Sequence, residues 1–165
     1  NADMQTSHTM SSLGIDKKDC GAFFAGTNMT RQTSYYVWAK SAIQRTFQLI
    51  QDGTGETAVR FGFGDAFKST NDKQDGVFLG SRNGDDVSLT RIKAARVAEN
   101  AATTETADYA NTDDTIDMWN GNTAGDVSTV GITLGLTAAQ TETLAGLIYD
   151  LCVGIGHTAL ETQDS

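Results

Sequence analysis

Three basic residues, Arg91, Lys93 and Arg96, lie within six positions of one another near the middle of the chain. The segment that carries them, Leu89–Ala98, has the spacing of a short helix. A local group of cations of this kind is suited to holding a phosphate group. The alternative is that the three bases neutralise acids such as those at 85–86 on an exposed helix end.

No group of residues in the sequence has catalytic spacing. His8 and His157 lie far apart, and neither belongs to a known zinc-binding pattern. Asp113, Asp114 and Asp117 could offer carboxylate oxygens to a hard cation, but a solvated acidic loop is the better interpretation. We therefore expect no catalytic residues, no metal site and no enzymatic activity.

Charge is distributed unevenly along the 165 residues. The net charge is −9, and all 12 Lys and Arg fall between Lys17 and Arg96. Residues 97–165 hold 11 acids and no base. This distribution excludes a broad basic surface that binds nucleic acid by charge alone, but it leaves room for a narrow basic strip. No apolar run is long enough to span a bilayer, so we expect no membrane partner.

The two cysteines leave two alternatives open. Cys20 and Cys152 are distant in sequence, and they could meet in the fold as a disulfide. Cys152 lies in an apolar run, where a free thiol behaves as a small hydrophobic side chain.

Periodicity predicts two long helices. From Thr33 to Gln51, apolar side chains recur at intervals of three or four residues, which indicates a helix over 33–51. Thr137 and Gln140 form a capping box at the start of a second helix over 137–153. We expect the two helices to pack together, with Ile148 and Leu151 in the core.

The remaining segments predict shorter elements. Residues 1–29 read as an extended arm, and 69–88 as a short helix or turn. Strands are expected at 57–61 and 127–134, with a long polar loop over 99–126. Together these elements predict one domain, 1–165, of a mainly α class: a four-helix-bundle-like subunit with a minor short β-sheet.

Two windows of sequence resemble the coat proteins of rod-shaped, tobacco-mosaic-like plant viruses. The run 147–156 (LIYDLCVGIG) is similar to the end of that family's last core helix, and Glu161 follows where the family has a Glu. The run 39–47 (AKSAIQRTF), followed by 59–61 (VRF), is similar to the family's Gln-Arg-x-Phe helix and Val-Arg-Phe strand. Arg91 falls where the family carries its RNA-contacting arginines.

The resemblance implies a structural coat subunit that self-assembles into a helical rod or filament around single-stranded RNA, in a virion and in the host cytoplasm during assembly. Arg91, Lys93 and Arg96, with Lys40 as a weaker candidate, would contact RNA phosphates. No cofactor is expected.

In such a polymer, copies would also bring carboxylates together. Glu99, Glu105 and Asp108 would lie near acids of neighbouring copies, which raises carboxylate pKa values and favours bound protons or Ca²⁺ between subunits.

A second interpretation comes from a different class of protein, a secreted filament or surface-appendage subunit without nucleic acid. It is favoured by the glycosylation sequon at 28–30 and by the composition rich in Thr, Asn and Gly. The chain starts at Asn1 rather than at a methionine, so we expect that it was either processed or trimmed. RNA that co-purifies with the protein would distinguish the two interpretations.

Overall fold

The structure is a computed structural model that describes residues 6–9, 19–31, 35–38, 47–51, 57–61, 67–69, 74–104, 115–118 and 123–162. Side chains are described for 19–27, 75–104 and 129–161.

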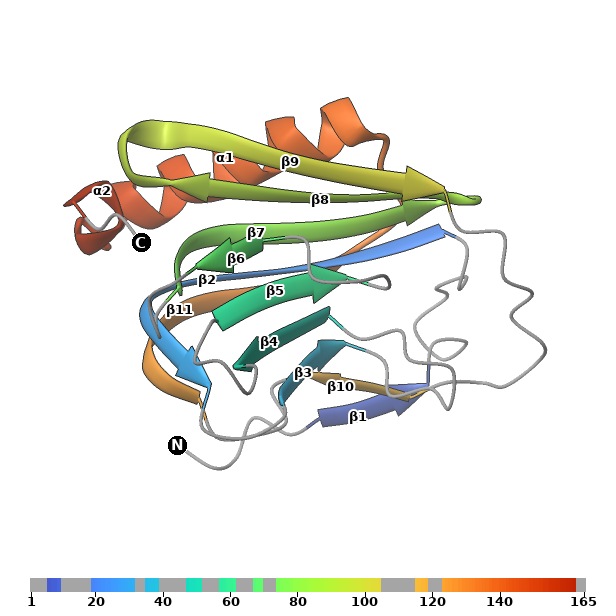
Figure 1. Cartoon of the computed structure of the whole chain (residues 1–165), viewed down its shortest axis with the longest axis horizontal. Helices are drawn as coiled ribbons and strands as arrows, with labels where there is room; N and C mark the ends of the chain where they lie inside the picture. The colour runs from blue at the N-terminus through green and yellow to red at the C-terminus, as the bar shows by residue number, and fades with distance from the viewer. Residues whose placement is uncertain are drawn as a thin grey trace.

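The largest element is a five-stranded antiparallel sheet in the order β11-β2-β7-β8-β9. Its strands are β2 (Asp19–Arg31), β7 (Gln74–Asn83), β8 (Asp86–Lys93), β9 (Val97–Thr104) and β11 (Thr123–Thr133). Figure 1 shows β9 at one margin of this sheet and β2 with β11 at the other. The β7–β8 connection is a two-residue loop that begins with Gly84, whose φ of 64° lies in the region that favours glycine.

A second sheet of four antiparallel strands lies against the first. It contains β3 (Tyr35–Trp38), β4 (Phe47–Gln51), β5 (Thr57–Phe61) and β6 (Phe67–Ser69), in chain order. β3 and β4 contact β2, while β5 contacts β7 and β8. The short strands β1 (Thr6–Thr9) and β10 (Thr115–Met118) form a separate pair.

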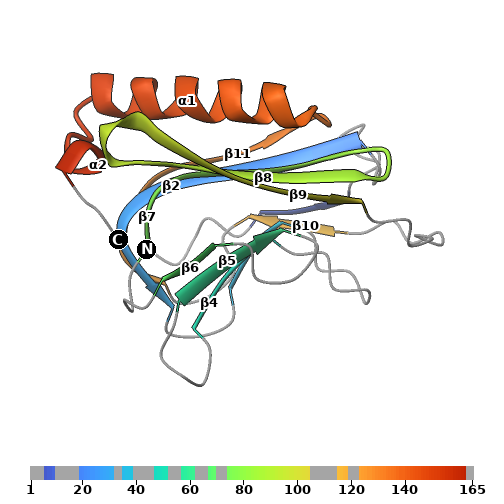
Figure 2. The same ribbon diagram turned by 45° about the horizontal axis from the view of Figure 1, so that its top comes forward.

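One long helix, α1 (Ala138–Gly154), covers the other face of the five-stranded sheet. Figure 2 shows α1, the five-stranded sheet and then the four-stranded sheet as three successive layers. Thr137 caps α1: its hydroxyl accepts from the backbone N–H of Gln140, whose side chain accepts from the backbone N–H of Thr137. A short helix, α2 (Ala159–Thr162), follows.

The central strands β2, β7 and β8 are buried on both faces, because alternate side chains point toward the helix and toward the second sheet. The helix face contributes to a core cluster of Ala25, Val77, Leu79, Ile92, Ala145, Ile148, Tyr149, Cys152 and Leu160. On the opposite face, one row of directly paired residues crosses all five strands: Val130, Phe24, Phe78, Arg91 and Glu99. Within this row, the rings of Phe24 and Phe78 stack with centroids 4.9 Å apart.

The predicted fold class, a mainly α four-helix-bundle-like subunit, is wrong: the described residues form mostly antiparallel strands with one long helix. The helix expected over 33–51 is absent from the described part of that segment, where Tyr35–Trp38 and Phe47–Gln51 are strands. Both strands are rich in aromatic and branched side chains, and their pairing with each other and with β5 outweighs the helical spacing.

Other expectations have mixed outcomes. Residues 89–98 are strand and turn rather than helix, and 75–83 with 86–88 form a hairpin rather than a short helix. Residues 99–126, expected as a loop, include the end of β9, β10 and the start of β11. The helix over 137–153 with its capping box and the strand at 57–61 are confirmed, and the strand expected at 127–134 corresponds to most of β11.

The two cysteines are both buried, and no disulfide joins them. Cys152 belongs to the core cluster on the helix face. Cys20 lies on the same face of β2 as Ala22 and Phe24, because the three are two residues apart. It therefore points to the face of the sheet opposite the helix. The sheet therefore separates the two thiols, and the disulfide alternative is wrong.

Candidate functional site

Arg91, expected at an exposed phosphate site, is buried on the face opposite the helix, with 3% of its surface exposed. Its Nε donates to the backbone carbonyl of Asp75 at 2.9 Å. Its guanidinium carbon lies 5.5 Å from the centroid of the Phe78 ring. Because Phe78 and Arg91 are direct cross-strand partners, the cation lies over the aromatic ring inside the sandwich.

Glu99 pairs with two of the four residues that were expected to contact RNA. Its Oε2 accepts from Arg91 Nη1 at 3.4 Å, and its Oε1 lies 2.7 Å from Lys93 Nζ. Arg91 and Lys93 are two residues apart on β8, so strand periodicity points both side chains to the same face as their neighbour on β9. Glu99, expected to face other copies, is therefore neutralised within its own chain.

Arg96 points away from the other two bases, toward α1. It ends the short 3-10 turn η2 (Ala94–Arg96) between β8 and β9, where Ala95 and Arg96 both have positive φ, at 58° and 59°. Its Nε and Nη2 donate to the two carboxylate oxygens of Asp150 at 2.8 and 3.0 Å. This bidentate pairing lowers the pKa of Asp150 and raises that of Arg96.

A glycine in α1 makes room for this pairing. A Cβ added at Gly146 would lie 2.8 Å from Nη2 of Arg96. The guanidinium therefore lies close to the helix at Gly146, one helical turn from Asp150.

The structure thus separates the expected basic strip into pairs with Glu99 and Asp150. Acids neutralise the bases, as the alternative interpretation held, although these are not the acids at 85–86. Lys40, Glu105 and Asp108 lie outside the described residues. Sequence reasoning missed the arrangement because a strand, not a helix, carries Arg91 and Lys93.

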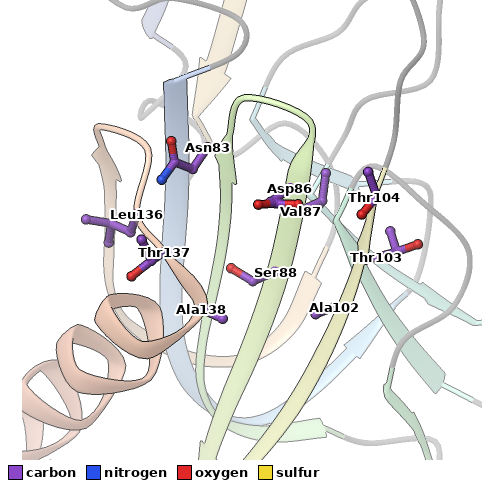
Figure 3. Close-up of a pocket in the computed structure, with 10 residues that line it drawn as sticks. All are labelled: Asn83, Asp86, Val87, Ser88, Ala102, Thr103, Thr104, Leu136, Thr137 and Ala138. Carbon is purple, nitrogen blue, oxygen red and sulfur yellow. The ribbon is translucent and has the colours of Figure 1, made fainter.

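A groove of about 330 Å³ lies beside the start of α1, next to the start of β8 and the end of β9 (Figure 3). It is lined by Asn83, Asp86, Val87, Ser88, Ala102, Thr103, Thr104, Leu136, Thr137 and Ala138. The Oγ atoms of Ser88 and Thr141 lie 3.1 Å apart beneath the helix, and the N–H of Leu136 donates to the Ser81 hydroxyl at 2.7 Å. Hydroxyls, one amide and one carboxylate provide polar contacts, but the lining holds no nucleophile paired with a base.

The outward face of α1 carries an apolar stripe. Leu147, Leu151 and Ile155 follow at intervals of four residues, and they are 57%, 61% and 68% exposed. Leu151, predicted as core, is therefore on the surface, whereas Ile148 is buried as predicted. A second groove of about 260 Å³ runs beside Leu147, with Ile92, Arg96, Ala98, Glu142 and Thr143 as its other lining residues.

Among the residues that the structure describes, no group of three or more His, Cys, Asp or Glu side chains could hold a metal ion. No helix in the described part of the chain is long and apolar enough to cross a membrane. No protein family, curated protein or solved structure matches this chain.

Proposed function

We propose that the chain is a non-catalytic structural subunit of a filament or surface appendage, which assembles with copies of itself through protein surfaces and without nucleic acid. The observation that carries the proposal is that acids of the same chain neutralise the basic strip of Arg91, Lys93 and Arg96. Arg91, Lys93 and Arg96 are held in ion pairs with Glu99 and Asp150 of the same chain.

Phosphate binding at these residues would require breaking those pairs. Arg91 would in addition have to leave a buried position over Phe78, which costs several kcal/mol when its carboxylate partner is left behind. Surfaces that could join copies are, by contrast, already exposed: the apolar stripe of Leu147, Leu151 and Ile155 lies on the outside of α1.

The RNA-coat function, its virion location and Ca²⁺ between subunits stay predictions. The resemblance implied a four-helix fold, but the described residues form a β-sandwich with one long helix. The fold therefore adds no support to these predictions.

The proposal is tested by purifying the protein, treating it with nuclease, and measuring its molar mass by sedimentation equilibrium over a wide range of protein concentration. We expect oligomers that persist after nuclease treatment. Binding through phosphate contacts weakens as salt is added. We expect a labelled single-stranded RNA to show no such salt-dependent binding. Particles that dissolve on nuclease treatment would overturn the proposal in favour of an RNA coat. A protein that is monomeric at every concentration would overturn both.

A further inference from the structure

The geometry points to β9 as a contact between copies: we propose that the β9 edges of two chains pair antiparallel, which joins their five-stranded sheets into one. This inference deepens the proposed function and rests on it, because it names the partner, a second copy, and the strand that binds it.

β9 is a long and open edge strand. In the described part of the chain it pairs with β8 alone, and Figure 1 shows it as the outermost strand of the sheet. All eight of its residues continue the ladder with β8 without a register shift, from Val97 opposite Lys93 to Thr104 opposite Asp86. Every second residue of such a strand directs its N–H and C=O away from the sheet, which is a template for another strand.

Apart from Glu99, which points to the sandwich face and is neutralised there, β9 lacks the usual protections of an edge strand. Its sequence, VAENAATT, has no proline, no lysine and no arginine. Edge strands that must not associate usually carry such residues, or bulges that twist the edge away. The opposite edge of the sheet, β11, has register shifts between Ala124 and Asp126 and between Val127 and Thr129. β11 is therefore a poorer template, and pairing of β9 with a second β9 is favoured over pairing of β9 with β11.

Charge on the edge also suits a second copy. The single charged residue of β9 is Glu99, and Arg91 and Lys93 of its own sheet neutralise it. A chain with a net charge of −9 can therefore approach its copy here without bringing uncompensated acids together.

Symmetry restricts the register of the pair. Residues directly opposite in an antiparallel ladder point to the same face of the sheet. The two-fold axis that relates two identical strands must therefore pass between one residue and the same residue of the second copy. An axis at Glu99 would oppose two carboxylates. An axis at Asn100 places Glu99 opposite Ala101, and an axis at Ala101 places Glu99 opposite Thr103. Both of these registers keep nearly all of β9 paired and oppose no like charges.

The deciding substitution is Ala101→Glu. It places a new carboxylate opposite Glu99 in the Asn100-centred register and opposite its own copy in the Ala101-centred register, so it opposes like charges in both. We expect the dissociation constant of the dimer to rise about tenfold at low salt, and less at high salt. Sedimentation equilibrium measures it. Leu134→Glu is the matched control, because it adds the same charge at an exposed residue directly after β11, the edge of the sheet opposite β9, and should leave the constant unchanged.

Ala101→Lys identifies the register. It places a lysine opposite Glu99 in the Asn100-centred register, which tightens the dimer, whereas it opposes two lysines in the Ala101-centred register, which weakens it. Amide hydrogen exchange adds a readout specific to the edge: alternate amides of β9 should become protected as the protein concentration rises. Circular dichroism checks that each variant retains the folded state.

Each outcome has a distinct meaning. An oligomer whose dissociation constant is the same in the wild type, Ala101→Glu and Leu134→Glu, with β9 amides that exchange freely, overturns the β9 contact and leaves the proposed function standing. A wild-type chain that is monomeric at every concentration overturns both.

Discussion

Arg96 and Asp150 join the turn between β8 and β9 to the second half of α1 by two parallel hydrogen bonds, Nε to Oδ1 at 2.8 Å and Nη2 to Oδ2 at 3.0 Å. Because both side chains are exposed, the pair is screened by solvent and its effect on stability is small. Its role is to hold a turn with two residues at positive φ in place on the helix.

The pH dependence of stability should reveal this pair. Arg96 lowers the pKa of Asp150 in the folded chain, so the pair stabilises the fold above the ordinary carboxyl pKa, and its contribution is lost as the pH falls through the lowered value. We expect Asp150→Asn to be less stable than the wild type at pH 5–7, with the difference shrinking below about pH 4 and vanishing only below the lowered pKa of Asp150. Urea denaturation at a series of pH values measures it, and a difference that persists at low pH would assign the effect to another cause.

Gly146→Ala should stabilise the protein more when Arg96 is absent than when it is present. Alanine in a helix interior is favoured over glycine by about 0.8–1 kcal/mol. In the wild type, however, the added Cβ would lie 2.8 Å from Nη2 of Arg96 and displace the guanidinium. We expect the full gain in the Arg96→Ala background and a smaller one in the wild type. Equal gains in the two backgrounds would show that Arg96 does not rest on Gly146.

Arg91 and Lys93 share Glu99 but should differ in their contribution to stability. Arg91→Ala removes a buried cation from Phe78, Asp75 and Glu99, and should lower the free energy of unfolding by about 3 kcal/mol. Lys93→Ala, at a more exposed position, should cost less than about 1 kcal/mol. Chemical denaturation of both variants tests the difference, and similar costs would contradict the buried placement of Arg91.

Ile148 and Leu151, three residues apart on α1, provide a matched pair of aliphatic truncations. Ile148→Ala removes a core side chain and should cost about 2–5 kcal/mol. Leu151→Ala alters an exposed side chain and should change stability by less than about 0.5 kcal/mol in the monomer. Thermal and urea unfolding of dilute protein decide between this orientation of α1 and one with Leu151 inside.

The parts of the fold that sequence could predict are those specified locally. The capping box at Thr137 and Gln140 defines the start of α1 through contacts within one turn. The run Thr57–Phe61 is strand-like by composition and is a strand.

The central strands were missed because they are buried on both faces. In β8, six consecutive residues from Val87 to Ile92 are buried, including the polar Ser88 and Thr90, and the short alternation of polar and apolar residues over 86–90 breaks at Arg91 and Ile92. Arg91 appears polar in sequence, yet its pairing across β7 and β9 places it beside Phe78 and Glu99. Such partners come from tertiary register, which the spacing of three bases along the chain does not encode.

The place of β2 in the sheet also has a kinetic consequence. β2 lies between β7 and β11, and Gly21 of β2 is opposite Ser81 on one side and Thr133 on the other. Pairing β2 with β11 closes a loop that contains all of the chain between them. This closure costs entropy before the stabilising contacts can form, and a high contact order slows folding. Until Thr133 and α1 arrive, β2 has an open edge and the helix face of the sheet is uncovered. The slow step of folding should therefore be the docking of residues 123–154. An intermediate formed before this step would expose the β9 edge, through which it could associate with other copies before folding is complete.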